Sequence, residues 1–150
     1  MKQTTKKITL TLLILLCSFT GAYAQTWSPM TSGTTASFLG VWGSSGSDVF
    51  AVSAGGKIFH YNGSTWSSMT SGITYDLIRV WGSSGSDVFA VGYSGTILHY
   101  NGSAWSAMTS GTTNTLYSVW GSSGSDVFAV GYSGTILHYN GSAWSAMTSG

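Results

Sequence analysis

Three histidines, His60, His99 and His138, stand 39 residues apart in this chain of 150 residues. Three imidazoles match the ligand number of many catalytic zinc sites. Each histidine, however, falls in the third predicted strand of a separate repeat unit, so the three side chains cannot converge on one ion. We therefore expect each to be satisfied within its own unit, and we expect neither a metal site nor a cofactor.

Three aspartates share the same spacing, and each follows a Gly-Ser-Ser-Gly-Ser loop: Asp48, Asp87 and Asp126. Such a loop could present a carboxylate to calcium, but calcium prefers several oxygen ligands and more than one carboxylate. Because each loop offers one, we expect a structural role in which the carboxylate accepts N–H groups of its own loop.

The sequence has few of the residues that hydrolytic enzymes use. Glycoside hydrolysis normally requires a pair of carboxylic acids flanking the scissile bond. The sequence has one arginine, Arg79, no glutamate and four aspartates. The only charged pair that does not repeat is Asp76 and Arg79, three residues apart on one predicted strand, and this is not a catalytic dyad. We expect no enzymatic activity.

The first 24 residues have the pattern of a signal peptide of bacterial type. Three lysines precede an apolar run over residues 8–19, and Ala22-Tyr23-Ala24 matches the small-x-small pattern before a cleavage site. The run is shorter than the roughly 20 residues that a membrane-spanning helix needs. We predict cleavage before Gln25 and a secreted, periplasmic or cell-surface location.

The remaining chain, residues 25–150, has two basic and four acidic residues, a net charge of −2, and no cysteine. Nucleic acids and anionic membranes are recognised by clustered Lys and Arg, so neither is an expected partner. Without cysteine there is no disulfide, and stability must come from burial or assembly.

The histidines and aspartates belong to a repeat. Residues 81–111 recur unchanged as residues 120–150, and a looser copy covers residues 42–72. A fixed period of this length indicates an array of one supersecondary unit. We assign units to about 34–72, 73–111 and 112–150, and an extra strand to 26–33 because this segment matches the end of a unit.

Each unit divides into four short strands. In the second unit we predict strands at 77–81, 87–91, 96–100 and 105–108, with turns at 82–86 and 92–95. Asn101-Gly102 predicts a type I′ hairpin turn, which needs positive φ at both residues. No window has helical periodicity, so almost no helix is expected.

These strands are apolar on both faces, and such strands must be covered on both faces. Four antiparallel strands per unit packed between neighbouring units describe the blades of an all-β propeller. Repeated aromatic residues are expected to close strands or to pack one blade against another. They are Trp42, Trp81, Trp120, Tyr61, Tyr100, Tyr139, Trp66, Trp105 and Trp144.

The unit resembles the kelch repeat. An apolar strand ending in Gly92 is followed by a strand ending in Tyr100, a polar turn, Trp105 and Met108. The second kelch glycine is replaced by Tyr93, and the period of 39 is shorter than the roughly 50 of kelch. Secreted bacterial propellers of the sialidase-like and photosystem-assembly-factor-like kinds are similar in length and Gly/Trp placement. All these resemblances imply a propeller, and none implies an activity.

The segment before each opening tryptophan is the part that differs between units. In a propeller it crosses one face and enters the innermost strand, where variable polar and aromatic side chains can form a ligand surface. The candidate ligand residues, which do not repeat, are Tyr75, Asp76, Arg79, Asn114, Tyr117 and Ser118.

Propellers close with about four to eight blades, and this chain has three. We expect a non-enzymatic binding module for a glycan or a protein. The alternatives are a structural array, closed by a homodimer or by a longer array, and a sialidase-like enzyme.

Overall fold

The computed structural model describes residues 27–148. The chain separates into two compact units, Met1–Met30 and Thr31–Gly150. The predicted signal peptide lies outside the described residues. All described strands belong to the second unit, which is considered by itself below.

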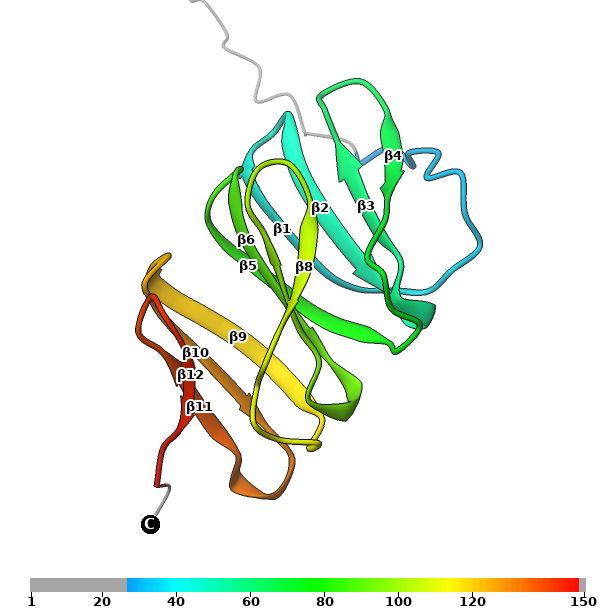
Figure 1. Ribbon diagram of the computed structural model, residues 1–150. Coiled ribbons are helices and arrows are strands. Elements are labelled where there is room, and N and C mark those ends of the chain that lie inside the picture. Colours follow the sequence, from blue (N-terminus) through cyan, green and yellow to red (C-terminus); the bar gives the residue numbers. More distant parts are fainter. Residues whose placement is uncertain (1–26, 149–150) are drawn as a thin grey trace, which may run out of the picture. The chain divides into compact units, whose positions relative to one another are not determined.

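The second unit consists of three four-stranded antiparallel sheets, one for each sequence repeat (Figure 1). Within each sheet the strands pair in chain order, as predicted. The first sheet contains β1 (Phe38–Ser45), β2 (Asp48–Ser53), β3 (Ile58–Tyr61) and β4 (Trp66–Met69). The second contains β5 (Leu77–Ser84), β6 (Asp87–Gly92), β7 (Ile97–Tyr100) and β8 (Trp105–Met108). The third contains β9 (Leu116–Ser123), β10 (Asp126–Gly131), β11 (Ile136–Tyr139) and β12 (Trp144–Ala146).

The described residues contain no α-helix, and their only helical elements are three 3₁₀ turns. These turns join the second and third strands of the sheets: η1 (Ala54–Gly56), η2 (Tyr93–Gly95) and η3 (Tyr132–Gly134). The second position of each turn has positive φ, 72° at Gly55 and 54° at Ser94.

No strand is formed over residues 27–37. The extra strand predicted for 26–33 is therefore absent from its described part, and Trp27 is fully exposed. A strand needs a partner edge for its backbone groups. In the second unit the fourth strand of every sheet is supplied by the repeat itself.

The first strand of each unit is longer than predicted. β5 continues through Trp81 and Gly82 to Ser84, so the tryptophan lies inside the strand instead of closing it. Gly82 is required for packing, because a Cβ there would lie 2.6 Å from the Trp42 ring of the preceding sheet. The turn is only Gly85-Ser86, next to an irregular register between Gly82 and Ser84.

The Asn-Gly loops also differ from the prediction. Asn101 N–H donates to the Ala104 carbonyl at 3.3 Å, so the loop spans four residues, and only Gly102 has positive φ. Asn101 Oδ1 accepts the N–H groups of Ser103 and Ala104, both at 3.0 Å. The asparagine side chain thus organises the loop, and its backbone does not need the left-handed conformation.

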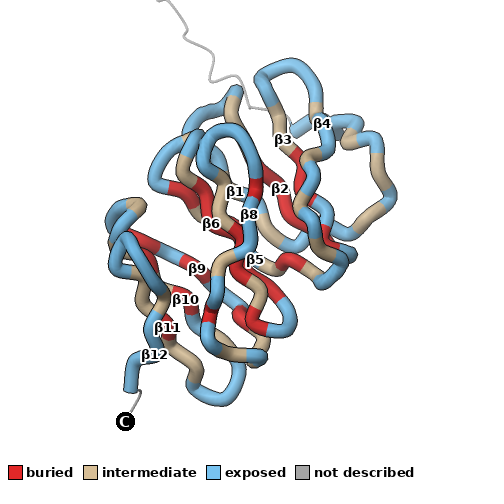
Figure 2. Tube along the Cα trace, in the orientation of Figure 1, coloured by how far each residue is buried: buried red, intermediate tan, exposed pale blue. Residues whose placement is uncertain are grey.

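Strand register places alternate residues on opposite faces. In the second sheet, Phe89 lies level with Trp81 and His99 on one face, and Val88 lies level with Tyr100 on the other. Phe89 belongs to the core shared with the third sheet, and Val88 to the core shared with the first sheet. The four residues 88–91 of β6 are all fully buried (Figure 2).

Burial on both faces, predicted for every unit, is complete only in the second sheet. In the first sheet Ala51 and Phe59 are buried, but Val41 on the same face is 69% exposed. In the third sheet Ala129 is fully buried but Val130 is 41% exposed. The first and third sheets each have one neighbouring sheet among the described residues, so one face of each lacks a facing sheet and is partly exposed.

Of the three later tryptophans, Trp105 and Trp144 pack between sheets, whereas Trp66 contacts Tyr61 of its own sheet. Trp105 Nε1 donates to the Met69 sulfur of the preceding sheet at 3.4 Å, and Trp144 Nε1 makes the same contact with Met108. Each of these tryptophans also contacts the tyrosine that ends the preceding strand, with ring centroids 5.3 Å apart. The first strands β1, β5 and β9 contact one another in order, as expected for the innermost strands of blades.

Candidate functional site

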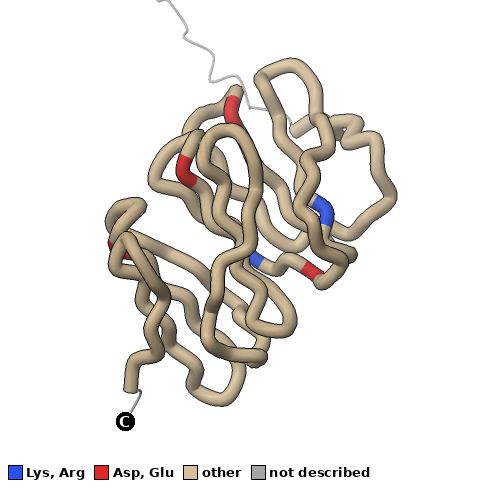
Figure 3. The backbone as a smooth tube through the Cα atoms, in the orientation of Figure 1, with Lys and Arg blue, Asp and Glu red and all other residues tan. Residues whose placement is uncertain are grey.

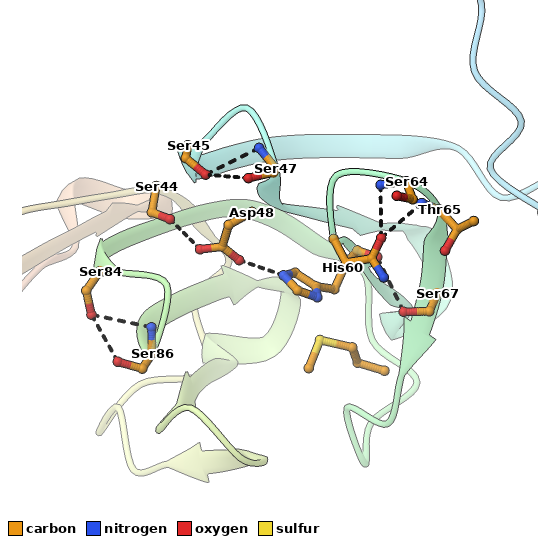
Figure 4. A network of polar contacts seen from close by, with 12 residues as sticks. Ser44, Ser45, Ser47, Asp48, His60, Ser64, Thr65, Ser67, Ser84 and Ser86 are labelled. Atoms are coloured by element: carbon orange, nitrogen blue, oxygen red, sulfur yellow. Dashed lines mark hydrogen bonds and ion pairs between the residues drawn. The ribbon is translucent and has the colours of Figure 1, made fainter.

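The repeated aspartate, histidine and serine form one network in each sheet. In the first sheet, Ser44 Oγ donates to Asp48 Oδ2, and His60 Nε2 lies 2.6 Å from Asp48 Oδ1 (Figure 4). A carboxylate can only accept hydrogen bonds, so Nε2 of this histidine carries the proton. The second and third sheets repeat the network at Asp87 and Asp126.

This network corrects the predicted role of the aspartates. Their carboxylates bind a serine hydroxyl and a histidine, not the N–H groups of their own loop. The register explains why: in β2 Asp48 is two residues before Phe50, which pairs with His60, so the acid and the imidazole share one face. The serine hydrogen bond is the largest cause that lowers the pKa of Asp48, opposed by burial and reinforced by His60.

The hydrogen-bonding sequence serine–aspartate–histidine indicates a structural role and not a catalytic one. The serine bonds to the carboxylate and not to the imidazole, so it is not paired with a base that could activate it. The carboxylate also reaches the next sheet, because a Cβ at Gly85 would meet Asp48 Oδ2 at 2.0 Å. The same holds for Gly124 and Asp87.

The three histidines lie on β3, β7 and β11, one in each sheet. Each is bonded to the aspartate of its own sheet, at 2.6, 2.6 and 2.8 Å. Across residues 27–148, no three His, Cys, Asp or Glu side chains lie together as a metal-binding group.

Two predicted ligand residues tie the first sheet to the second. Asp76 Oδ1 accepts the N–H of Gly55 in η1 at 2.7 Å. Arg79 Nη1 donates to the Leu39 carbonyl in β1 at 2.7 Å. The two side chains thus have separate partners in the preceding sheet, which identifies both as inter-sheet contacts.

Tyr75 and Asn114 lie at one open hollow of about 850 Å³. Its other walls are η2, the adjoining part of β7 and β8, and the linker into β9. Asn114 Nδ2 donates to Thr135 Oγ1 at 2.8 Å, so part of its hydrogen-bonding capacity is used within the third sheet. Tyr75 is 55% exposed.

Tyr117 and Ser118 are exposed on β9. Near them the structure reveals two exposed tyrosines that the sequence analysis did not select, Tyr93 and Tyr132. Both belong to the identical stretch, so a search for residues that differ between units passed over them. Tyr93 and Tyr132 begin η2 and η3, whereas the equivalent residue in the first unit, Ala54 of η1, is an alanine. This difference from the first unit was the available signal.

The four exposed tyrosines lie at the same end of the strands. Tyr93 N–H donates at 3.0 Å to the carbonyl of Asp76, the residue that follows Tyr75. Tyr132 N–H donates to the Thr115 carbonyl at 2.8 Å, two residues before Tyr117. We call this set the tyrosine edge: Tyr75, Tyr93, Tyr117 and Tyr132, with exposures between 48% and 61%.

Charge is sparse throughout the described chain (Figure 3). The cations are Lys57 and Arg79, and Arg79 is engaged with the Leu39 carbonyl. A second hollow of about 400 Å³ lies beside Arg79 and β1, and a third of about 390 Å³ lies between β4 and Trp105. Apolar and hydroxyl groups therefore dominate the surfaces that a ligand would meet.

Between residues 27 and 148, no helix has the length and apolar character needed to cross a membrane.

Three four-stranded sheets that pack face to face in chain order define a β-propeller-type repeat array. Solved propeller structures share this fold. YCF48 bound to D1 peptide matches with a TM-score of 0.69 and 18% identity, over 83% of this chain and 43% of that chain. YCF48 from Cyanidioschyzon merolae matches with a TM-score of 0.63 and 17% identity, over 79% of this chain and 41% of that chain.

The chain thus spans about two fifths of the length of these two solved chains. No protein-family model matches the sequence. No curated protein matches it either. The propeller expectation is therefore confirmed at the level of fold, whereas the kelch-like and sialidase-like resemblances find no support among these matches.

Proposed function

We propose that this chain is a non-enzymatic, propeller-type module that binds a protein segment along the tyrosine edge. The observation that carries the proposal is the exposure of four tyrosines at one end of the strands, where Tyr75 also lines an open hollow of about 850 Å³. Tyrosine is enriched at protein interfaces because its ring offers a large contact area and its hydroxyl a hydrogen bond.

A peptide is the most suitable first ligand to test. The similar fold in YCF48 was solved bound to D1 peptide. The hollow beside Tyr75 is open and has both apolar and hydroxyl-bearing walls, including Met108 and Thr112. An extended peptide could place side chains there while its backbone remains accessible to hydroxyl groups.

Selection from a displayed random-peptide library tests this function. We expect binders whose affinity falls at least tenfold when Tyr75 and Tyr132 are both changed to alanine. Ser142→Ala is the control, because this residue lies in the loop at the opposite end of the strands and only its backbone is hydrogen-bonded. Peptides that bind the double variant as tightly as the wild type would contradict the proposal, as would binding confined to a glycan array.

Export through the segment before Gln25 belongs to the same proposal and rests on the sequence pattern. A bacterial expression host would test it directly, because cleavage gives a new N-terminus at Gln25 in the exported fraction. Retention of Met1 in that fraction would contradict it.

A second candidate function is self-assembly into a closed array. It is favoured by one observation: the first and third sheets each have a partly exposed apolar face with no facing sheet among the described residues.

A further inference from the structure

The two faces that have no facing sheet among residues 27–148 are the two halves of an interface that the chain already forms twice between its own sheets. Every sheet has a trailing face, which covers the sheet that follows, and a leading face, which receives the sheet before it. On the third sheet the trailing face comprises Trp120, Phe128, Val130, Ile136, His138 and Met147. On the first sheet the leading face comprises Val41, Gly43, Val49, Ala51, Phe59 and Trp66. Ala51 and Phe59 are already buried within the chain, whereas Val41 is 69% exposed.

Inside the chain, these faces meet through specific contacts. The Trp42 ring lies over Gly82, and the Trp81 ring lies over Gly121, each 2.6 Å from the position a Cβ would take. In the same interface, Trp105 Nε1 of β8 donates to the Met69 sulfur of β4. The glycine removes the side chain that would block the ring, which makes this a contact of complementary shape.

The trailing face of the third sheet has the same residue types, but no other sheet of the described chain packs on it. Trp120, equivalent to Trp42 and Trp81, is 59% exposed. Val130 is 41% exposed, whereas its equivalents Val52 and Val91 are fully buried. The Asp126 side chain is 44% exposed, against 26% for Asp87, which packs against Gly124 of the following sheet.

The leading face of the first sheet has the matching features. Gly43 is exposed, whereas Gly82 and Gly121 are buried beneath tryptophan rings. The atoms nearest to a Cβ at Gly43 belong to its own sheet. Gly46, equivalent to the Gly85 that meets a carboxylate of the preceding sheet, has no atom within 4 Å of its Cβ position.

The two faces also agree in sequence. Valine, glycine, alanine and tryptophan stand at equivalent leading positions in all three sheets. The departures are Phe38 and Phe59, where the other sheets have leucine. Their rings contact edge to face at 5.4 Å, and Phe38 is 41% exposed, so this exchange enlarges the apolar surface.

We propose that a second copy of this chain covers both faces, docked head to tail. In this arrangement Trp120 lies over Gly43 of the other copy, and Trp66 donates to the sulfur of Met147. Two copies supply six sheets, within the four to eight that close a propeller. Both interfaces then form at once, and no face of the array is left open. This inference rests on the second candidate function and is independent of peptide binding at the tyrosine edge.

Two charged variants test the docking. Val41→Glu damages the leading face and Trp120→Glu damages the trailing face, and both side chains are mostly exposed in one chain. We expect the wild type to have twice the mass of one chain by light scattering and each variant to have the mass of one. Ser103→Ala is the control and keeps the double mass, because this exposed residue lies in a loop of the second sheet and only its backbone is hydrogen-bonded.

Mixing the two variants gives the decisive result. Each supplies the face that the other lacks, so a mixture restores one intact interface and a particle with the mass of two chains. Circular dichroism and thermal unfolding of each variant verify that it is folded. A wild type with the mass of one chain, a folded variant that remains double, or a mixture that stays single would overturn the proposal. None of these outcomes depends on whether library peptides bind.

Discussion

At the scale of single residues, one carboxylate in each sheet connects three elements. Asp48 holds Ser44 and His60 of its own sheet and packs against Gly85 of the next. The hydrogen bonds favour the charged carboxylate, and they lower the pKa of Asp48 below its ordinary value of 3.8. Asp126 has the same serine and histidine partners and a lowered pKa for the same reasons.

Ser44→Ala is predicted to raise the pKa of Asp48 toward 3.8, because the serine hydrogen bond is its largest cause. A folded-state pKa below the unfolded one stabilises the protein above the unfolded pKa, and the stabilisation is lost as pH falls through the folded pKa. The variant should therefore lose this contribution at a higher pH than the wild type during acid unfolding. Carboxyl titration by NMR measures the shift.

Ser45→Ala is the control for that titration, since Ser45 Oγ contacts Ser47 and not the carboxylate. Equal Asp48 titration curves for Ser44→Ala and the wild type would show that the hydroxyl does not set this pKa.

At the scale of elements, the same sequence has different surroundings in different sheets. Phe89 of β6 and Phe128 of β10 occupy equivalent positions in identical segments, yet Phe89 is fully buried and Phe128 is half-buried. Phe89 contacts Tyr139 and Trp144 of the third sheet, with ring centroids 5.7 and 6.2 Å away. Position in the array therefore decides how much each repeated side chain stabilises the fold.

Phe89→Ala is predicted to lower the free energy of unfolding by about 3–5 kcal/mol, the usual cost of removing a buried phenylalanine. Phe128→Ala should cost much less, because its ring is already partly in water. Both are to be compared by denaturant unfolding in the Val41→Glu background, which keeps the chain single. Equal losses for the two variants would contradict the assigned burial.

Much of this element structure could be predicted from the repeat. The four strands, their pairing order and the packing of Trp105 between sheets follow from periodicity and apolar runs. The continuation of β5 past Trp81 could not, because Gly82 is read as a turn residue until the Trp42 ring over it is seen. The Asp48–His60 pair required the strand register, which brings residues 12 apart onto one face.

The candidate site was only partly predictable for a related reason. Variation between units selected Tyr75 and Tyr117, which are exposed, but also Asp76 and Arg79, which bond to the preceding sheet. Sequence variation does not distinguish a side chain facing a ligand from one facing a neighbouring sheet. Tyr93 and Tyr132 were missed because they lie in the identical stretch, which a search for differences between units passes over.

At the scale of the whole molecule, the second unit is an array of three sheets with complementary ends. The internal interfaces bury Phe50, Leu98 and Leu137 almost completely, and burial of this kind is the main source of stability in a chain without disulfides. The outer faces carry the same apolar residue types, and Val41 and Trp120 on them are mostly exposed to water. Covering them by a second copy would extend to every sheet the surroundings that the second sheet already has.

Analytical ultracentrifugation of the wild-type chain over a series of concentrations tests this account most directly. A head-to-tail pair predicts a mass of two chains that persists as the sample is diluted and gives way to one chain only at the lowest concentrations. Particles of continuously increasing mass would indicate open chains of copies, and a mass of one chain throughout would mean that the end faces remain uncovered. Either of these two results would contradict the closed pair.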